Sequence, residues 1–330
     1  MLLLAYNSNN NITLHITKLF TWSIYSMFRS SIIKLIFVNL LIFLASDALA
    51  IEKEKAENNE PILWAGCGIT KKAFMTELAK AYTAKTGVEI TLQGGGATKG
   101  IRNAAKGNID IGGACRATLA GEKIEKDAYQ IPVAWDALVV VVNKENPVNS
   151  ITFKELQKIY QGKITNWKEL GGDNAPIELY IRKGKISGVG RTLRELVFAD
   201  YNKEFKAKYV VKSSGPLEKG IVKNLYGLGT TGISSAKRRE LKILKLEDKE
   251  PSYENIKKGE YLLYRPLYLV TKGPKNTSPK VKKFISFALG REGRAIIRKA
   301  GTVPYADAIH LVMKQLKQHK RARASGIYEN

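Results

Sequence analysis

Apolar residues between positions 61 and 113 fall into short blocks whose spacing changes from one block to the next. Residues 61–67 and 88–92 are short apolar runs typical of strands, and residues 110–113 predict a third, buried strand. Apolar residues recur at helical spacing over 74–82, and a second helix is predicted from about Thr98. This order of strand, helix, strand, helix, strand indicates a parallel sheet. Such sheets bind ligands at the carboxyl ends of their strands.

The rest of the chain predicts a second lobe. A nearly continuous apolar run at 131–143, IPVAWDALVVVVN, predicts a strand that crosses from one lobe to the other. A helix at 153–160 and a strand at 177–181 follow, and residues 261–270 predict the strand that crosses back. Two helices within 279–299 then complete the first lobe. The pattern therefore predicts an α/β protein of two lobes.

The stretch from Thr91 to Arg116 combines glycine turns with the start of a helix. Glycines 94–96 let backbone N–H groups approach a ligand closely, because no Cβ intervenes. The helix predicted from Thr98 adds unpaired N–H groups and the positive end of its dipole, which favour a small oxyanion. A glycine cluster is a weak motif by itself, so an ordinary βαβ unit with glycine turns is an open alternative.

Residues 182–192 repeat this design. Arg182 follows a predicted strand, and the turn at Ser187-Gly188 leads into a helix. A guanidinium fork and N-terminal amides suit a tetrahedral oxyanion. Two such stretches, far apart in the sequence, indicate two lobes that face each other across a cleft. The alternative is that Arg182 is a surface arginine that pairs with a neighbouring acid.

The strongly positive net charge of the chain is consistent with an anionic partner. The 330 residues include 54 Lys and Arg against 30 Asp and Glu, for a net charge of +24. Nucleic acid, an anionic membrane surface and small anions are all candidate partners. Only residues 314–323 form a basic run, and neither zinc-finger spacing nor an RNA-binding aromatic motif occurs. We therefore expect a generally basic surface without nucleic-acid binding, and keep a polyanion-binding surface protein as the alternative of a different class.

The amino-terminal segment predicts export. Residues 27–50 combine a positive start, an apolar core at 35–44 and a small-x-small cleavage site that ends at Ala50. Met27 is the expected start, with residues 1–26 as an upstream extension, and no stable membrane insertion is expected after cleavage. A lipoprotein box that ends at Cys67 is the competing interpretation. A polar stretch separates that box from the apolar core, and a tryptophan fits it poorly.

Six motifs in order resemble those of the phosphate-binding proteins of ABC importers, within the type II periplasmic binding-protein superfamily. The resemblance covers about residues 61–305. Any one motif is weak, but their shared order is specific. They are Gly66–Thr70, Gly94–Thr98, Asp110–Arg116, Gly162–Leu170 (GKITNWKEL), Arg182 with Ser187-Gly188, and Glu292–Pro304.

The resemblance implies the two-lobed type II fold, in which each lobe is a mainly parallel sheet flanked by helices and two hinge crossings join the lobes. Residues 51–135 and 265–313 would form lobe 1, residues 136–264 lobe 2, and residues 314–330 a basic C-terminal tail. The implied function is an exported, periplasmic receptor that captures inorganic phosphate in the cleft and delivers it to an ABC transporter permease. We expect a monomer, no cofactor and no enzymatic activity. A receptor for sulfate, molybdate or a similar oxyanion is the alternative.

Carried over residue by residue, the resemblance implies a set of phosphate-binding residues. They are Gly68, Ile69, Thr70, Gly96, Ala97, Thr98, Cys115, Arg116, Arg182, Ser187, Gly188 and Val189. Three positions depart from the family: Ala97 replaces a common serine, Val189 a threonine, and Cys115-Arg116 a Ser-Asp or Ser-Arg pair. An aspartate would accept a hydrogen bond from protonated phosphate, whereas Arg116 would add donors and charge. Selectivity for phosphate over sulfate is therefore open.

The two cysteines, Cys67 and Cys115, end the first and third predicted strands, which this fold places side by side. In an exported protein such a pair is often oxidised, so a disulfide is possible. Two buried free thiols are the alternative, because adjacent parallel strands do not always offer disulfide geometry. The three histidines lie in the leader and near the C-terminus. We therefore expect neither a catalytic residue nor a metal site.

Overall fold

The computed structural model describes Asn39 and residues 60–324. Apart from Asn39, the predicted leader (1–50) lies outside the described residues, and so does the last part of the predicted tail (325–330). The chain divides into two units between residues 59 and 60, and every element below belongs to the second unit. Within the described part of the chain, no helix is long and apolar enough to cross a membrane.

Twelve strands are formed within the described residues. They are β1 (Ile62–Gly66), β2 (Ile90–Gly94), β3 (Ile111–Ala114), β4 (Tyr129–Asn143), β5 (Ser150–Ile151), β6 (Glu178–Arg182), β7 (Tyr209–Val211), β8 (Gly227–Gly232), β9 (Leu241–Ile243), β10 (Lys245–Leu246), β11 (Tyr264–Thr271) and β12 (Val303–Pro304).

The helices alternate with the strands in the first two thirds of the chain. The α-helices are α3 (Gly68–Thr70), α4 (Thr76–Thr86), α5 (Gly96–Lys106), α6 (Phe153–Tyr160), α7 (Gly188–Leu193), α8 (Ser214–Val222), α9 (Ile233–Ala236), α10 (Tyr253–Lys258), α11 (Pro279–Leu289), α12 (Arg291–Lys299) and α13 (Leu311–Ala324). Two π-helical segments, η1 (Lys71–Met75) and η4 (Arg194–Phe198), continue α3 and α7. Short 3-10 turns are η2 (Lys123–Glu125), η3 (Trp167–Leu170), η5 (Pro274–Asn276) and η6 (Tyr305–Ala308).

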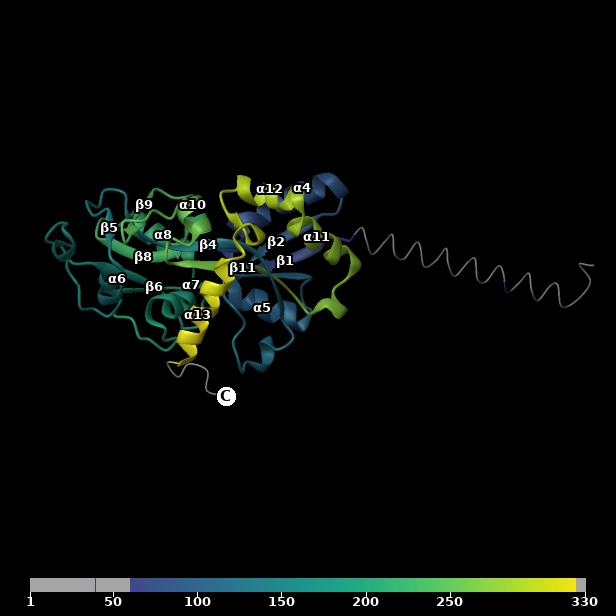
Figure 1. Cartoon of the computed structure of the whole chain (residues 1–330), viewed down its shortest axis with the longest axis horizontal. Coiled ribbons are helices and arrows are strands. Elements are labelled where there is room, and N and C mark those ends of the chain that lie inside the picture. The colour runs from purple at the N-terminus through teal and green to yellow at the C-terminus, as the bar shows by residue number, and fades with distance from the viewer. Residues whose placement is uncertain (1–38, 40–59, 325–330) are drawn as a thin grey trace, which may run out of the picture. The chain divides into compact units, whose positions relative to one another are not determined.

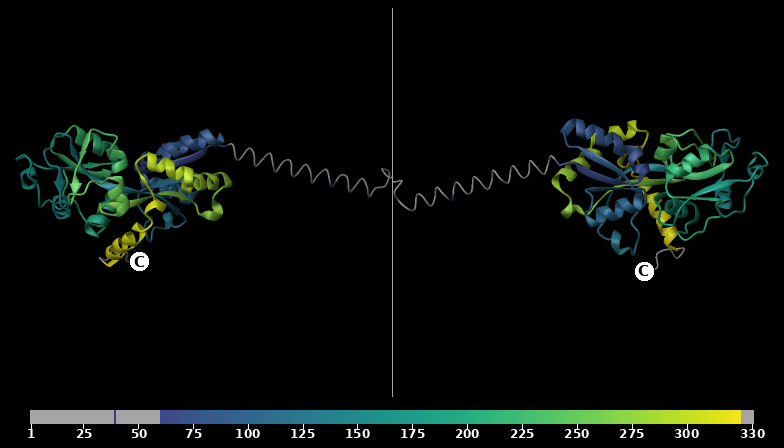
Figure 2. Two further views of the ribbon diagram at one scale, coloured as in Figure 1. Left: turned by 45° about the horizontal axis from the view of Figure 1, so that its top comes forward. Right: turned by 180° about the vertical axis from the view of Figure 1, so that it is seen from behind.

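One sheet runs through both halves of the molecule in the order β2-β1-β3-β11-β4-β8-β6-β7. β1 pairs in parallel with β2 and β3, and β6 pairs in parallel with β7 and β8. The two parallel groups are joined by β4 and β11, which pair with each other antiparallel. Figure 1 shows the groups on either side of these two strands, and both views of Figure 2 repeat the arrangement. The predicted two-lobed α/β fold with two crossings is confirmed.

β4 explains how one sheet serves two lobes. Its first part, up to Ala137, pairs with β11, whereas residues 138–142 pair with β8. From Val133 onward every residue of the strand is buried, which accounts for the unbroken apolar run in the sequence. The strand is antiparallel to its neighbours, but because both of its faces are covered it has the continuous apolar composition that is more usual for buried parallel strands. The change of partner lies close to the predicted lobe boundary at 135/136, which stays a prediction.

The helices cover the sheet on both faces. Around β1 and β2, α4, α11 and α12 lie on one face and α5 on the other (Figure 1). Trp135 of β4 is buried where the strands cross, and its ring stacks on Tyr305 at a centroid distance of 4.7 Å. This packing makes the crossing region part of the hydrophobic core.

The predicted basic tail begins inside a helix. α13 starts at Leu311, which is fully buried, and the Lys314 ammonium donates to the Gly259 carbonyl oxygen. Residues 311–324 therefore continue the folded structure beyond residue 313, where the sequence predicts lobe 1 to end. Apolar Leu311 and Val312, just before the basic run, are the sequence signal for this packing.

Candidate anion-binding site

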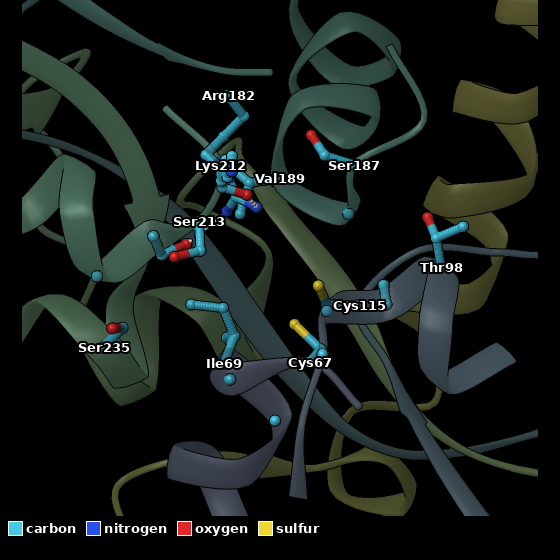
Figure 3. A pocket seen from close by; sticks show the side chains of 18 of the residues that line it. Cys67, Ile69, Thr98, Cys115, Arg182, Ser187, Val189, Lys212, Ser213 and Ser235 are labelled. Carbon is cyan, nitrogen blue, oxygen red and sulfur yellow. Dashed lines mark hydrogen bonds between the residues drawn. The ribbon is translucent and has the colours of Figure 1, made fainter. Parts of the chain in front are cut away.

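A cavity of about 600 Å³ lies between the loops that follow the parallel strands of the two groups (Figure 3). Its lining comes from the ends of β1, β2, β3, β6 and β7 and from the helices that follow them. The lining residues are Cys67, Gly68, Ile69, Lys72, Gly94, Gly95, Gly96, Ala97, Thr98, Cys115, Arg182, Lys183, Ile186, Ser187, Gly188, Val189, Lys212, Ser213, Ser214, Gly215 and Ser235.

Two helix starts form the wall on the β1–β3 side. The first is at Gly68, where a helical run through α3, η1 and α4 follows β1 directly. The second is at Gly96, where α5 follows β2 and no side chain caps the helix. Gly96 has a φ of 83°, in the left-handed region that glycine adopts readily. Both helices therefore present their first backbone N–H groups, which lack partners within the helix, at the cavity.

The wall on the β6–β8 side is built from α7 and α8. Ser187 caps α7, because its hydroxyl accepts a hydrogen bond from the Gly190 N–H at 3.2 Å. Gly188 and Val189, the first two residues of α7, line the cavity. α8 begins at Ser214, and Ser213 and Ser214 both line the cavity. Four helix starts therefore converge on one space, which favours an anion.

Arg182, the last residue of β6, points into the region between these two helix starts (Figure 3). Its Nη1 donates to the Ser214 hydroxyl at 2.9 Å, and its Nη2 donates to the Lys212 carbonyl oxygen at 2.9 Å. Its Nε is buried and has no hydrogen-bond partner within the described protein atoms. The two hydrogen bonds thus fix the guanidinium at the cavity, and the Nε–H is left for a ligand.

The cavity is strongly positive. Lys72, Arg182, Lys183 and Lys212 line it, and none of its lining residues is an aspartate or a glutamate. The Lys72 ammonium donates to the Ser235 hydroxyl at 2.6 Å and lies 3.9 Å from the buried Glu218 carboxylate. Burial lowers the pKa of Lys72, and the charge of Glu218 opposes that effect. The excess of cations over carboxylates attracts anions of any geometry.

Ten of the twelve predicted binding residues line this cavity. Thr70 does not: its side chain is fully buried, and its hydroxyl donates to the Ala114 carbonyl oxygen at 3.1 Å. Its position on the inner face of the helix turns the hydroxyl toward β3. Thr70, predicted as a binding residue, therefore does not present its side chain to the cavity in this structure.

Arg116 also lies outside the cavity, with only 3% of its surface exposed. Its Nη1 and Nη2 donate to the two oxygens of the buried Glu125 carboxylate at 2.9 and 2.7 Å. Its Nε donates to the Ile186 carbonyl oxygen, on the β6–β8 side, at 3.0 Å. The sequence predicted that Arg116 would add hydrogen-bond donors and charge to the site. Because Glu125 pairs with its guanidinium, it does not. Nothing in the sequence around Glu125 predicts that it pairs with Arg116.

The sequence prediction missed a group of cavity residues, chiefly on the β6–β8 side. They are Lys72, Lys183, Lys212, Ser213, Ser214, Gly215 and Ser235. The segment Lys212–Gly215 follows strand β7 and starts α8, so it repeats the pattern of strand, polar turn and helix seen at 182–188. That repeat could have identified it. Lys72 and Ser235 carry no comparable local signal.

Both cysteines are free thiols in the structure, so the possible disulfide is not formed. They are buried, and the Cys115 thiol is hydrogen-bonded to the Cys67 sulfur. That hydrogen bond lowers the pKa of Cys67, with smaller contributions from Arg265 and from the Thr70 and Ile69 backbone, and outweighs the effect of burial. The same hydrogen bond and burial raise the pKa of Cys115. Adjacent parallel strands have brought the two sulfurs together without bonding them.

Contacts on both sides of the cavity hold its two walls together. The Thr98 hydroxyl donates to the Ile186 carbonyl oxygen at 3.2 Å. Arg265 of β11 donates from Nη1 to the carbonyl oxygens of Cys115 and Gly188, at 3.0 and 3.3 Å, so one guanidinium joins both walls. Its Nη2 also lies 3.4 Å from the buried Asp136 carboxylate. The two walls are therefore in direct contact through Thr98 and through Arg265.

Comparison with known proteins identifies the family to which this fold and site belong. A family model described as a PBP superfamily domain matches residues 56–292. The phosphate-binding protein PstS of Borreliella burgdorferi is 29% identical over 277 residues, which cover 80% of this chain and 97% of that protein. The protein SphX of Synechococcus elongatus is 30% identical over 239 residues, covering 66% of this chain and 69% of that protein.

Solved structures agree. A putative phosphate ABC transporter substrate-binding protein from Clostridium perfringens, determined with bound phosphate, has a TM-score of 0.67 and 30% identity. The match covers 74% of this chain and 99% of that one. An ABC-type phosphate transport receptor from Vibrio cholerae gives a TM-score of 0.59 and 27% identity, with 74% and 99% coverage. The chain belongs to the PBP superfamily, and within it to the phosphate-binding proteins of ABC importers.

Proposed function

We propose that the chain is a receptor that captures inorganic phosphate in this cavity and delivers it to an ABC importer. The observation that carries the proposal is the convergence of four helix starts and four cationic side chains on a space without carboxylates. Such a site stabilises a small, multiply charged oxyanion through N–H donors from every side. The names of the relatives support phosphate as that anion.

In the proposed complex the two walls share the anion. The Nε of Arg182 would donate from the β6–β8 side, together with the amides of Gly188 and Val189. The amides at the start of α5, around Ala97 and Thr98, would donate from the β1–β3 side. A ligand held by both walls favours the closed arrangement, because its binding energy is realised only when the walls meet. The receptor binds and releases its ligand unchanged, so we propose no catalytic step.

One observation bears on selectivity among oxyanions and makes other anions candidate ligands. No lining residue is a carboxylate, so no charged oxygen is placed to accept a hydrogen bond from protonated phosphate or to repel sulfate. Sulfate, molybdate and arsenate are therefore competitors for the same donors. Serine hydroxyls at 213, 214 and 235 can accept a hydrogen bond from a protonated ligand, which favours phosphate without excluding sulfate.

Calorimetric titration of the purified protein with phosphate, sulfate, molybdate and arsenate tests this function. We expect phosphate to bind with a dissociation constant of about 1 μM or less, equivalent to about −8 kcal/mol. Sulfate should bind more weakly. Tighter binding of sulfate than of phosphate would move the function to another oxyanion, and no binding of any of the four would refute it.

We also propose export to the periplasm as a monomer, with translation from Met27 and cleavage after Ala50. The support is the charge and hydropathy pattern of residues 27–50. N-terminal sequencing of periplasmic material should begin at Ile51. A mature protein that begins with a lipid-modified Cys67 would contradict this processing.

A further inference from the structure

The two cysteines are chemically unlike the rest of the cavity, and the proposed oxyanion binding does not require sulfur. Within the described residues they are adjacent in space because β1 and β3 are adjacent in the sheet. Gly66 is opposite Gly113 in the parallel register, and the Cys67 N–H donates to the Gly113 carbonyl oxygen at 2.8 Å. Figure 3 shows both sulfur atoms beside each other at the same side of the cavity. Both residues line it.

The groups around the two cysteines favour the thiolate form of Cys67 and the thiol form of Cys115. Cys67 immediately precedes the helix that begins at Gly68, whose first amides face its sulfur. The Arg265 guanidinium lies close enough to stabilise negative charge on either sulfur. The interaction between the two side chains lowers the pKa of Cys67 and raises that of Cys115. A thiolate at a helix start beside a cation is the reactive form of cysteine.

The charge of the cavity restricts which thiol-seeking ligand can enter. Four cationic side chains line it, and the described residues contain no cluster of three or more His, Cys, Asp or Glu that could hold a metal. Zinc prefers four such ligands, so two sulfurs inside a positive wall suit it poorly. An uncharged oxyacid that reacts with thiols is not repelled by the cationic side chains and does not need four ligands. Trivalent arsenic in water, As(OH)₃, is such a species, and its hydroxyl groups match the polar donors that line the site.

We propose that Cys67 and Cys115 form a dithiol site that captures trivalent arsenic inside the cavity, and that this capture and oxyanion binding exclude each other. In the reaction, As(OH)₃ forms two As–S bonds and loses two As–O bonds. The two displaced hydroxyls leave as two molecules of water, one with the Cys115 thiol proton and the other with a proton from the Cys67 thiol or, where Cys67 is ionised, from solvent. Arsenic stays trivalent throughout, so no oxidant or reductant is needed. The exclusion, but not the capture, rests on the proposed function.

The test uses the full chain, reduced and then freed of reductant, with sodium arsenite and phenylarsine oxide as probes. Intact mass should show one arsenic per chain, and thiol titration should show both cysteines protected. Cys67→Ala and Cys115→Ala are matched variants, because each leaves a single thiol. Each should weaken arsenite binding by at least about 100-fold, the advantage of two linked contacts over one. Circular dichroism of each variant establishes that it is folded.

Three results would overturn the capture: binding to a single-cysteine variant as tight as to the parent, free titration of both thiols at saturating arsenite, or zinc binding tighter than arsenite. Competition is measured separately, by titrating phosphate into the arsenic-loaded protein. Loss of phosphate binding supports exclusion, whereas unchanged phosphate binding refutes it. If the parent binds arsenite but no oxyanion, the dithiol site stands and the proposed function fails.

Discussion

Arg182 is the side chain on which anion affinity should depend most. Ser214 and the Lys212 carbonyl fix its two Nη atoms, so its orientation is set before a ligand arrives. Charge-assisted hydrogen bonds are worth about 1.5–3 kcal/mol each. We expect Arg182→Ala to cost about 2–4 kcal/mol of phosphate binding, a loss of about 30- to 1000-fold. Calorimetry on the variant, with its melting temperature, measures both affinity and stability.

Two further variants separate a ligand contact from a general effect of charge. Arg182→Lys should recover only part of the affinity, because a point charge cannot replace the fork. Arg191→Ala removes a neighbouring arginine that stacks on Tyr201 and does not line the cavity, so phosphate affinity should stay within about twofold. Equal losses in Arg182→Ala and Arg191→Ala would show that Arg182 acts only through net charge.

Glu125 has a structural role that is visible in its pKa. Burial raises that pKa, but Arg116, the Leu119 N–H and Arg102 together outweigh burial and hold it below its ordinary value of 4.5. The ionised carboxylate therefore stabilises the fold above the unfolded-state pKa. This contribution is lost as pH falls through the lower pKa of the folded protein.

We expect Glu125→Gln to destabilise the protein by about 3–5 kcal/mol at neutral pH, because it leaves the Arg116 charge buried without a counter-ion. The difference between parent and variant should begin to shrink as pH falls below about 4.5, where the carboxylate protonates in the unfolded chain, and should be lost as pH falls through the lower pKa of the folded protein. Urea unfolding across this pH range measures it. A difference that stays constant with pH would show that ionisation of Glu125 contributes nothing.

Helix α7 closely approaches the opposite wall, and Gly188 at its start makes that approach possible. A Cβ at this position would lie 2.3 Å from the Cys115 sulfur and 3.2 Å from the Ala97 Cβ. Gly188→Ala should therefore hold the walls apart and lower phosphate affinity at least about tenfold, a cost of about 1.4 kcal/mol. Calorimetry measures the affinity, and helicity by circular dichroism shows that α7 persists.

The double variant Gly188→Ala with Cys115→Ala tests that explanation, because it removes the sulfur that the new methyl group meets. It should bind phosphate more tightly than Gly188→Ala alone, although the Ala97 contact limits recovery. Residues in contact are expected to couple in this way. Purely additive losses would place the effect of Gly188→Ala elsewhere than in the approach of the two walls.

Elements with a strong local pattern could be predicted, and side-chain directions could not. The apolar run at 131–143 identified β4, and glycines 94–96 identified the turn into α5, because composition alone determines both features. The direction of the Thr70 hydroxyl depends on the rotation of its helix against β3. The pairing of Arg116 with Glu125 depends on a turn between β3 and β4 that carries no periodic signal. Both errors therefore concern contacts between elements.

For the molecule as a whole, β4 and β11 serve as both hinge and core, and Arg265 is the polar group placed at their junction. It is buried and joins Cys115 on one wall to Gly188 on the other. Asp136, directly opposite Arg265 in the β4–β11 register, balances its charge. The arrangement of the two walls should thus depend on one ion pair within the crossing strands.

Substitutions of Arg265 and Asp136 distinguish the contribution of this ion pair to stability from its contribution to phosphate binding. Arg265→Met should destabilise the fold by about 3–5 kcal/mol, because it leaves a buried Asp136 whose pKa burial already raises and Arg265 lowers. Arg265→Met with Asp136→Asn removes the uncompensated charge and should recover most of that stability. It cannot restore the two hydrogen bonds to Cys115 and Gly188, so phosphate affinity should stay at least about tenfold below the parent value, or about 1.4 kcal/mol. Urea unfolding and calorimetry on both variants measure the two quantities. Recovery of affinity together with stability would mean that Arg265 only balances Asp136 and does not position the walls.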